Sequence, residues 1–223
     1  MTRYTTRRGV RTGVKLWRVQ PDESAHQVTP DGVLDLMWFR DRLVVAGPDT
    51  HAMTSEAVPA EVTWGLQFAP GVAAALLGLP AAELTDRRVE LSDLVKLPGN
   101  LPHDPPDRLE QVFLTLWRRA DPDPATLRLA AELDRAARAG LSVRETARTF
   151  ALSERSLRRL SNTLFGYGTK TLTRIHRFQR ALGLARAGVP LGEAAATSGF
   201  ADQAHFTRDA RQLTGRTPAA LSR

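Results

Sequence analysis

The stretch PLGEAAATSGFADQAHFTRDARQLTGRTPAAL, residues 190–221, repeats an earlier stretch of the same chain, LSVRETARTFALSERSLRRLSNTLFGYGTKTL, residues 141–172. Arg159 of the first copy matches Arg208 of the second, with one extra residue inserted at the turn. Similarity at a fixed spacing indicates a duplicated structural unit. Two copies of one helix–turn–helix unit explain the pattern.

Each copy carries start and stop signals for two short helices. Ser142 and Glu145 form a capping box for the first helix of the first copy, and Ser153 caps its second helix. In the second copy Asp202 takes the same capping position and Gly215 ends the helix. The second helices of the two copies are therefore expected over residues 153–165 and 202–214.

These second helices, called the reading helices below, carry long hydrogen-bonding side chains on their outer faces. Arg can pair with guanine edges and Gln with adenine edges in the DNA major groove. For one such helix alone a solvated polar face is the better explanation, but two copies in a basic region favour DNA. The side chains predicted to face the bases are Arg155, Arg158, Arg159, Gln203, Thr207 and Arg208.

The segment between the two units, residues 169–188, has apolar residues at helical spacing. A helix of this length would be about 28 Å long and would hold the reading helices roughly one DNA turn, about 34 Å, apart. Both could then enter successive major grooves on one side of a duplex. The side chains predicted to contact phosphates along the way are Arg174, Arg177, Arg180 and Arg186.

The charge of the chain is concentrated in the same region. The net charge is +7, yet residues 1–123 carry 14 Lys and Arg against 17 Asp and Glu, while residues 124–223 carry 17 against 7. This asymmetry favours a polyanion-binding half joined to an ordinary one. No cysteine is present, which excludes disulfides and thiol chemistry. No apolar run reaches the roughly 20 residues of a membrane helix, so we expect a cytoplasmic protein with no membrane partner.

The first part of the chain is predicted to be β structure. Residues 33–39 and 43–47 flank the polar turn Arg40-Asp41-Arg42, which indicates a hairpin, and residues 61–68 alternate apolar and polar side chains. The pattern becomes helical after Pro70.

Four prolines within residues 97–107 indicate a boundary. The helix predicted next, over residues 107–120, has one apolar stripe. The stripe is expected either to dock on its own β domain or to form a homodimer with a second copy. Its members are Leu109, Val112, Phe113, Leu116 and Trp117.

At the C-terminus the motif GFADQAHFTRDARQLTGRTP, with the pattern S.R.L.R in the first reading helix, resembles the AraC/XylS family of transcription regulators. The resemblance covers residues 124–223 and implies a seven-helix DNA-binding domain, a double-stranded DNA operator and RNA polymerase as a further partner. The family has Phe where this chain has Ser161 and Ala210. These departures imply either looser packing or compensation elsewhere in the core.

The N-terminal stretches PDGVLDLMW, VAGPDTHA and LQFAPGVAAALLGLPAAEL resemble the β-rich, cupin-like region of unknown function that precedes such domains. In the family, a domain of this kind senses a small molecule, dimerises the protein, or does both. The resemblance therefore implies an effector or dimerisation role for this half of the chain. The identity of an effector does not follow.

These observations predict an α+β protein in which a β-rich cupin-like domain precedes an all-α tandem helix–turn–helix domain. The expected divisions are an effector or dimerisation domain over residues 1–106, a connecting helix and linker over 107–123 and an AraC-type domain over 124–223. The expected function is sequence-specific transcription regulation under small-molecule control. The alternatives are an N-terminal domain that binds a protein partner or only dimerises, and a metal-dependent cupin-type enzyme fused to a DNA-binding domain.

An enzyme is the minor hypothesis. His26, Asp31, Asp35, Asp49 and His51 offer metal-binding or acid–base groups, but hairpin-flanking polar residues account for them better. The sequence has no phosphate-binding loop, no dinucleotide fingerprint and no nucleophile-elbow motif. We therefore expect no catalytic residues, no metal and no cofactor. On the predicted helices, His205 is expected to pack beside the turn or to touch phosphate.

Overall fold

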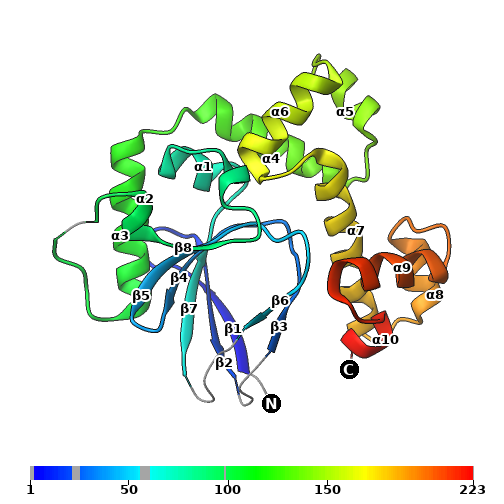
Figure 1. The fold of residues 1–223 in the computed structure, drawn as a ribbon, viewed down its shortest axis with the longest axis horizontal. Coiled ribbons are helices and arrows are strands. Elements are labelled where there is room, and N and C mark those ends of the chain that lie inside the picture. Colours follow the sequence, from blue (N-terminus) through cyan, green and yellow to red (C-terminus); the bar gives the residue numbers. More distant parts are fainter. Residues whose placement is uncertain (1–2, 22–25, 56–60, 98, 223) are drawn as a thin grey trace.

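The first half of the chain builds a six-stranded antiparallel sheet in the order β1-β2-β7-β4-β5-β8 (Figure 1). A separate two-stranded sheet pairs β3 with β6. The computed structural model describes residues 3–21, 26–55, 61–97 and 99–222. The strands are β1 (Arg3–Arg8), β2 (Lys15–Gln20), β3 (His26–Val28), β4 (Asp35–Phe39), β5 (Arg42–Ala46), β6 (Met53–Ser55), β7 (Thr63–Gln67) and β8 (Arg88–Glu90).

The predicted hairpin is confirmed as the pair β4 and β5. Arg40 and Asp41 join the strands with φ angles of 48° and 59°, so both residues are left-handed. A two-residue turn of this kind has the twist that antiparallel strands require, and Asp tolerates the conformation better than most residues. The turn fixes the register in which Leu36 lies opposite Val45, and both side chains enter the core.

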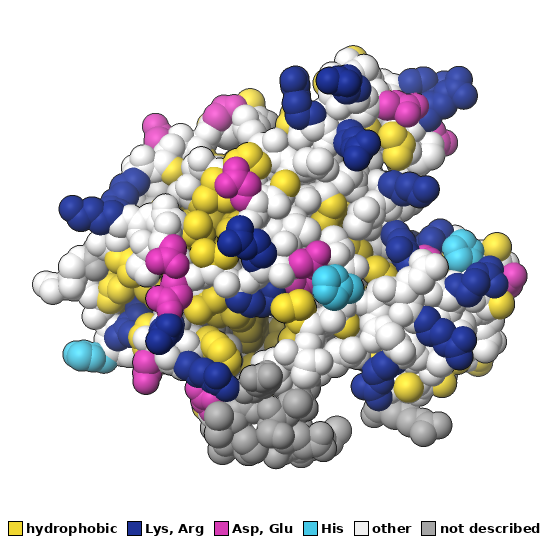
Figure 2. Space-filling model, viewed as in Figure 1, with side chains coloured by type: hydrophobic (Ala, Val, Ile, Leu, Met, Phe, Trp, Pro, Cys, Tyr) yellow, Lys and Arg dark blue, Asp and Glu magenta, His cyan; other side chains and the backbone are white. Residues whose placement is uncertain are grey.

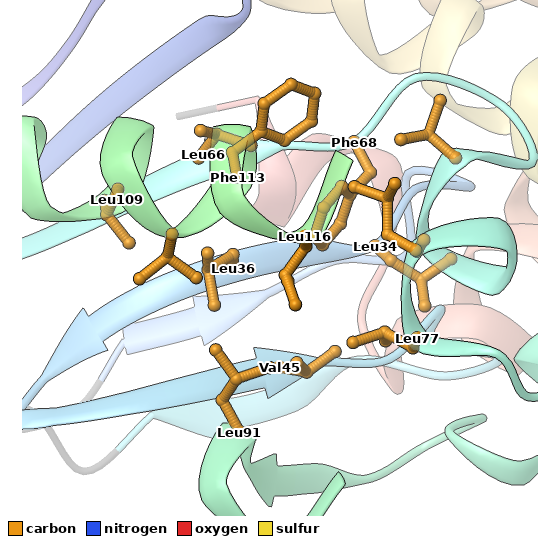
Figure 3. Close-up of a cluster of buried hydrophobic side chains, with 14 of the residues drawn as sticks. Leu34, Leu36, Val45, Leu66, Phe68, Leu77, Leu91, Leu109, Phe113 and Leu116 are labelled. Carbon is orange, nitrogen blue, oxygen red and sulfur yellow. The ribbon is translucent and has the colours of Figure 1, made fainter. Parts of the chain in front are cut away.

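Three helices and a short 3-10 turn complete the N-terminal half: α1 (Val72–Leu77), η1 (Ala81–Glu83), α2 (Leu91–Leu94) and α3 (Pro105–Ala120). The stripe of α3 packs on the sheet, and Figure 3 shows Leu109, Phe113 and Leu116 meeting strand residues such as Leu36 and Leu66. Leu109, Val112, Phe113 and Leu116 are at most 7% exposed. The stripe docks on the chain's own sheet, the first of the two alternatives, except at Trp117, which is 37% exposed.

Seven helices follow in the described residues after Asp123: α4 (Pro124–Arg138), α5 (Val143–Thr149), α6 (Glu154–Phe165), α7 (Thr169–Arg186), α8 (Leu191–Thr197), α9 (Gln203–Thr214) and α10 (Pro218–Leu221). The predicted capping box of Ser142 and Glu145 is present. Ser153 and Asp202 cap α6 and α9, as predicted, and Gly166 and Gly215 end them in the left-handed conformation. The predicted fold class, a β-rich half before an all-α tandem helix–turn–helix half, is confirmed.

A second hydrophobic core holds these helices together, with Leu157, Ile175, Phe178 and Phe206 among its fully buried members. Ser161, one of the two departures from the family pattern, is 0% exposed within it. Its hydroxyl has no hydrogen-bond partner among the described residues. A buried hydroxyl without a partner lowers the stability of the fold, because its hydrogen bonds to water are lost on folding and are not replaced.

The two halves of the chain are in contact, which the sequence did not predict. The N-terminal half donates hydrogen bonds to backbone carbonyls at the C-terminal ends of both reading helices. Thr85 Oγ1 donates to the Gly166 carbonyl at 3.0 Å, and the Ala52 amide donates to the Leu213 carbonyl at 2.6 Å. The last carbonyls of a helix have no partner within it, so these bonds satisfy groups that otherwise need water.

We expect Ser161→Ala to raise the free energy of unfolding by about 1 kcal/mol, because it removes an unpaired buried hydroxyl and leaves the packing nearly unchanged. Urea denaturation of the full chain measures this. Ser92→Ala, at an exposed position of α2, controls for helix propensity. A loss of stability larger than that of the control would show that the Ser161 hydroxyl has a partner.

Candidate DNA-binding interface

The first reading helix, α6, separates its side chains by face. Its N-cap, Ser153, accepts a hydrogen bond from the Ser156 amide at 3.0 Å, which fixes where the helix starts. Leu157 and Leu164 are buried against the other helices. The opposite face presents three exposed guanidinium groups, those of Arg155, Arg158 and Arg159, as the sequence led us to expect.

The second reading helix, α9, is arranged in the same way. Phe206 and Leu213 are buried, while Gln203 and Arg208 are exposed. Thr207 is only half-exposed, and its hydroxyl donates to the carbonyl of Gln203 at 2.9 Å, so it offers DNA its methyl group and an acceptor oxygen but no free proton. Arg211, which the sequence analysis overlooked, borders the same open recess as Gln203 and Arg208.

Helix α7 carries both units. Its 18 residues give a rod of about 27 Å at 1.5 Å per residue. Leu172, Ile175 and Phe178 are 0% exposed, and α7 contacts both α6 and α9. In Figure 1, α5 and α6 lie near one end of α7, and α8 and α9 lie near the other. Packing on both sides of one helix fixes the two reading helices relative to each other.

Two of the arginines predicted to contact phosphates have an acidic partner within the chain. Arg174 and Arg177 are ion-paired with Asp209 of α9, with Arg174 Nε 3.2 Å from Oδ1 and Arg177 Nη2 2.8 Å from Oδ2. The Arg177 guanidinium also stacks over the Phe200 ring at 4.3 Å. Both arginines border a groove of about 570 Å³, but their charge is shared with a carboxylate that is 8% exposed. They act first as a clamp that holds α9 on α7.

Two further basic residues of α7, Arg180 and Arg186, have backbone partners. Arg180 Nη2 donates to the Arg138 carbonyl at 2.8 Å, and Arg186 Nε donates to the Leu221 carbonyl at 3.2 Å. Lys170, missed in the sequence analysis, is exposed and borders the same groove as Arg177. His205 packs edge-on against Phe200 with ring centroids 5.2 Å apart, so its position beside the turn is confirmed.

The surface of this half is strongly basic. In the space-filling view, Lys and Arg side chains are spread over the right side of the molecule, where α5 to α9 lie (Figure 2). Acidic side chains are more frequent over the N-terminal half in the same view. The charge asymmetry seen in the sequence therefore becomes a one-sided basic surface, which attracts the phosphate backbone of DNA at long range.

The outer face of α6, which carries its predicted base-reading side chains, lies beside the N-terminal half. The outer face of α9 borders a recess lined by α9 residues alone. A groove of about 480 Å³ has Pro80 and Ala82 on one wall and residues of α6 on the other. The α6 side chains on this groove are Arg155, Ser156, Arg158, Arg159, Asn162 and Thr163. The segment around η1 therefore lies next to the side chains predicted to enter the first major groove.

The polar residues weighed as a metal or acid–base site lie apart from this interface. Asp49 pairs with Arg88, with Oδ2 2.8 Å from Nη2, and His51 Nδ1 lies 3.4 Å from Asp86 Oδ1. The side chain of His26 lies outside the described residues. Within the described ranges, no group of three or more His, Asp or Glu side chains is placed to hold a metal ion. None of the described helices has the length and apolar character needed to cross a membrane.

Comparisons with known proteins agree with this geometry. Residues 146–223 match the family model described as a helix-turn-helix domain, and residues 14–90 match a domain of unknown function, DUF6597. No curated protein matches the chain. The chain is similar in structure to ToxT from Vibrio cholerae O395, with a TM-score of 0.51 and 9% identity over 98% of this chain and 96% of that one.

Two further ToxT structures have similar TM-scores, identities and coverages. One, from Vibrio cholerae, has a TM-score of 0.47 and 10% identity over 98% of this chain and 97% of that one. The other is ToxT from strain O395 bound to (E)-4-(8-methylnaphthalen-1-yl)but-3-enoic acid, with a TM-score of 0.47 and 10% identity over 98% of both chains. The family match over residues 146–223 confirms the sequence prediction that the chain carries an AraC-type helix–turn–helix domain at its C-terminus.

We expect Asp209→Asn to lower the free energy of unfolding by about 1–2 kcal/mol, because it leaves the half-exposed Arg174 and Arg177 without their shared carboxylate. Thermal and urea unfolding of the full chain measure the change. Glu132→Gln removes one negative charge at an exposed position of α4 and serves as the matched control. Equal stability of the two variants would show that the clamp contributes nothing to the fold.

Proposed function

We propose that this AraC-type regulator reads two successive major grooves of one duplex, with α6 in the first and α9 in the second. The observation that carries the proposal is the pair of exposed polar faces fixed on one rod, α7. In the first groove, the donors to guanine edges are Arg155, Arg158 and Arg159. In the second groove, Gln203 suits adenine edges and Arg208 suits guanine edges. Lys170 and the half-exposed Arg177 border the groove between the units, where a phosphate backbone would pass.

Control by a small molecule acting through the N-terminal half completes the proposal. The support for it is the contact between the halves, which includes hydrogen bonds to the C-terminal ends of both α6 and α9. A change in the N-terminal half that alters these contacts would change how the two reading helices are presented.

Hydroxyl-radical footprinting of the full chain on DNA upstream of its own and neighbouring genes tests the proposal. We expect two protected segments on one side of the duplex, about one helical turn of 10–10.5 base pairs apart. Protection of a single segment would contradict the use of both helices on one duplex. Binding with no sequence preference would contradict the assignment of base-reading roles.

Arg208→Ala should weaken binding to a specific operator by about 1–3 kcal/mol and relax sequence preference at one position of the second half-site. Arg159→Ala should do the same at the first half-site. Fluorescence anisotropy with the operator and with single-substituted operators measures both effects. Arg118→Ala removes an exposed charge from α3 in the N-terminal half and should leave affinity unchanged. A uniform loss across all sequences would make Arg208 a phosphate contact.

A further inference from the structure

The outer face of the first reading helix has a neighbour from the other half of the chain. Helix α6 contacts both α1 and η1, and Figure 1 shows α1 beside it. Pro80 and Ala82 face α6 across the groove of about 480 Å³, whose other wall includes Arg155 and Arg159. The predicted base-reading side chains of α6 therefore share one groove with the N-terminal half.

Close packing holds α6 in this place. A Cβ on Gly166, which ends α6 with a φ angle of 86°, would lie 2.5 Å from Pro48 Cγ and 2.6 Å from Thr85 Oγ1. A Cβ on Gly71 would lie 2.6 Å from that of Ala130 in α4. Thr85 Oγ1 adds its hydrogen bond to the Gly166 carbonyl at 3.0 Å. The first helix–turn–helix unit is thus packed directly against the N-terminal half.

A helix in the DNA major groove leaves no room for a second protein segment beside it. The groove is about 12 Å wide and a helix with its side chains is about 10–12 Å across, so a sugar–phosphate strand lies along each flank. A strand that follows the 12 residues of α6, about 18 Å, contains about five nucleotides at about 3.4 Å each. The groove beside α6 has the volume of about 16 water molecules at about 30 Å³ each, which is too small for five sugar–phosphate units.

The N-terminal segment beside α6 does not have the charge of a DNA-binding surface. Residues 79–86 include Glu83 and Asp86 and contain no Lys or Arg. A surface that contacts phosphates is expected to be basic, whereas these two carboxylates repel them. The segment is therefore expected to leave α6 when DNA enters and not to share the duplex with it.

The second reading helix is placed differently. The N-terminal half reaches α9 at its C-terminal end, where the Ala52 amide donates to the Leu213 carbonyl at 2.6 Å and Gln27 Nε2 donates to the Thr214 carbonyl at 2.8 Å. The recess on the outer face of α9 is lined by residues of α9 itself: Gln203, Ala204, Thr207, Arg208 and Arg211. The base-reading side chains of α9 are therefore accessible while the two halves are in contact.

We propose that the N-terminal half masks α6 and leaves α9 accessible, so that the chain engages DNA first through α9 and through α6 only after its two halves separate. The inference rests on the proposed function, because it states how access to one of the two reading helices is regulated. Since α7 packs on both α6 and α9, the C-terminal half separates as one body. Separation breaks the bonds from Thr85 and Ala52, and operator affinity falls in proportion to the fraction of chains that are separated.

A reversible cross-link across the groove tests the inference. The chain has no cysteine, and Ala82 and Thr163 are exposed on opposite walls of the groove, so a chain with Ala82→Cys and Thr163→Cys can be bridged by a bismaleimide with a cleavable disulfide spacer. Hydroxyl-radical footprinting on the operator, at saturating protein, is the measurement. We expect the same chain capped with N-ethylmaleimide to protect both half-sites, and the cross-linked chain to protect the second half-site alone. Reduction of the spacer should restore protection of the first.

Protection of both half-sites by the cross-linked chain would overturn the inference, because DNA would then reach α6 beside the N-terminal half. Loss of protection at both would overturn it too, because α9 would then not read DNA while the halves are in contact. The capped chain tests the proposed function separately. If the capped chain fails to protect two half-sites, the proposed function is wrong, whatever the cross-linked chain does.

Thr85→Val tests the cost of separation without a cross-link. The substitution keeps the shape of the side chain but removes the donor to the Gly166 carbonyl, so we expect operator affinity to rise about fivefold. Thr115→Val removes a comparable hydroxyl from α3 and is the matched control, with unchanged affinity expected. Fluorescence anisotropy measures both, and thermal unfolding verifies that both variants are folded. Unchanged or lower affinity of Thr85→Val would contradict a contact between the halves that limits DNA binding.

Discussion

The burial of one face of α7 against both helix–turn–helix units is the constraint on which the DNA-binding arrangement depends. Leu172, Ile175 and Phe178 have no solvent-accessible surface, so α7 cannot rotate relative to either unit without opening the core. Two separately weak contacts with DNA reinforce each other when their separation matches the duplex, and most strongly when that separation is fixed in advance. The same packing explains why the Asp209 ion pairs lie where α7 meets α9: two arginines and a carboxylate hold one reading helix at its distance from the other.

The local elements could be predicted from the sequence because their signals are local. Ser142 with Glu145, Ser153 and Asp202 mark helix starts by hydrogen bonds that span only a few residues, and the polar turn at Arg40 and Asp41 marks the hairpin in the same way. The duplicated unit and the faces of its helices followed from periodicity alone. The direction of Arg155 and Arg208 needed nothing beyond helix geometry.

The rest depended on partners distant in the sequence. Arg177 looked like a free phosphate contact because nothing near it in the chain is acidic, but Asp209, one helix unit later, pairs with it. The stripe of α3 gave no indication of whether its own sheet or a second copy would cover it. Asp35 and Asp49 read as polar residues around a hairpin, because their partners, the indole of Trp17 and the guanidinium of Arg88, cannot be placed beside them without the fold.

The hydrogen bonds between the halves have a consequence for mutagenesis. Their acceptors are the carbonyls of Gly166 and Leu213, and one donor is the amide of Ala52. The bond from the Ala52 amide joins two main-chain groups and survives replacement of either side chain, whereas the Thr85 hydroxyl and the Gln27 side-chain amide, which donates to the Thr214 carbonyl at 2.8 Å, are lost on substitution to alanine. Alanine scanning would therefore detect only part of the contact between the halves, because the Ala52 bond persists in every such variant.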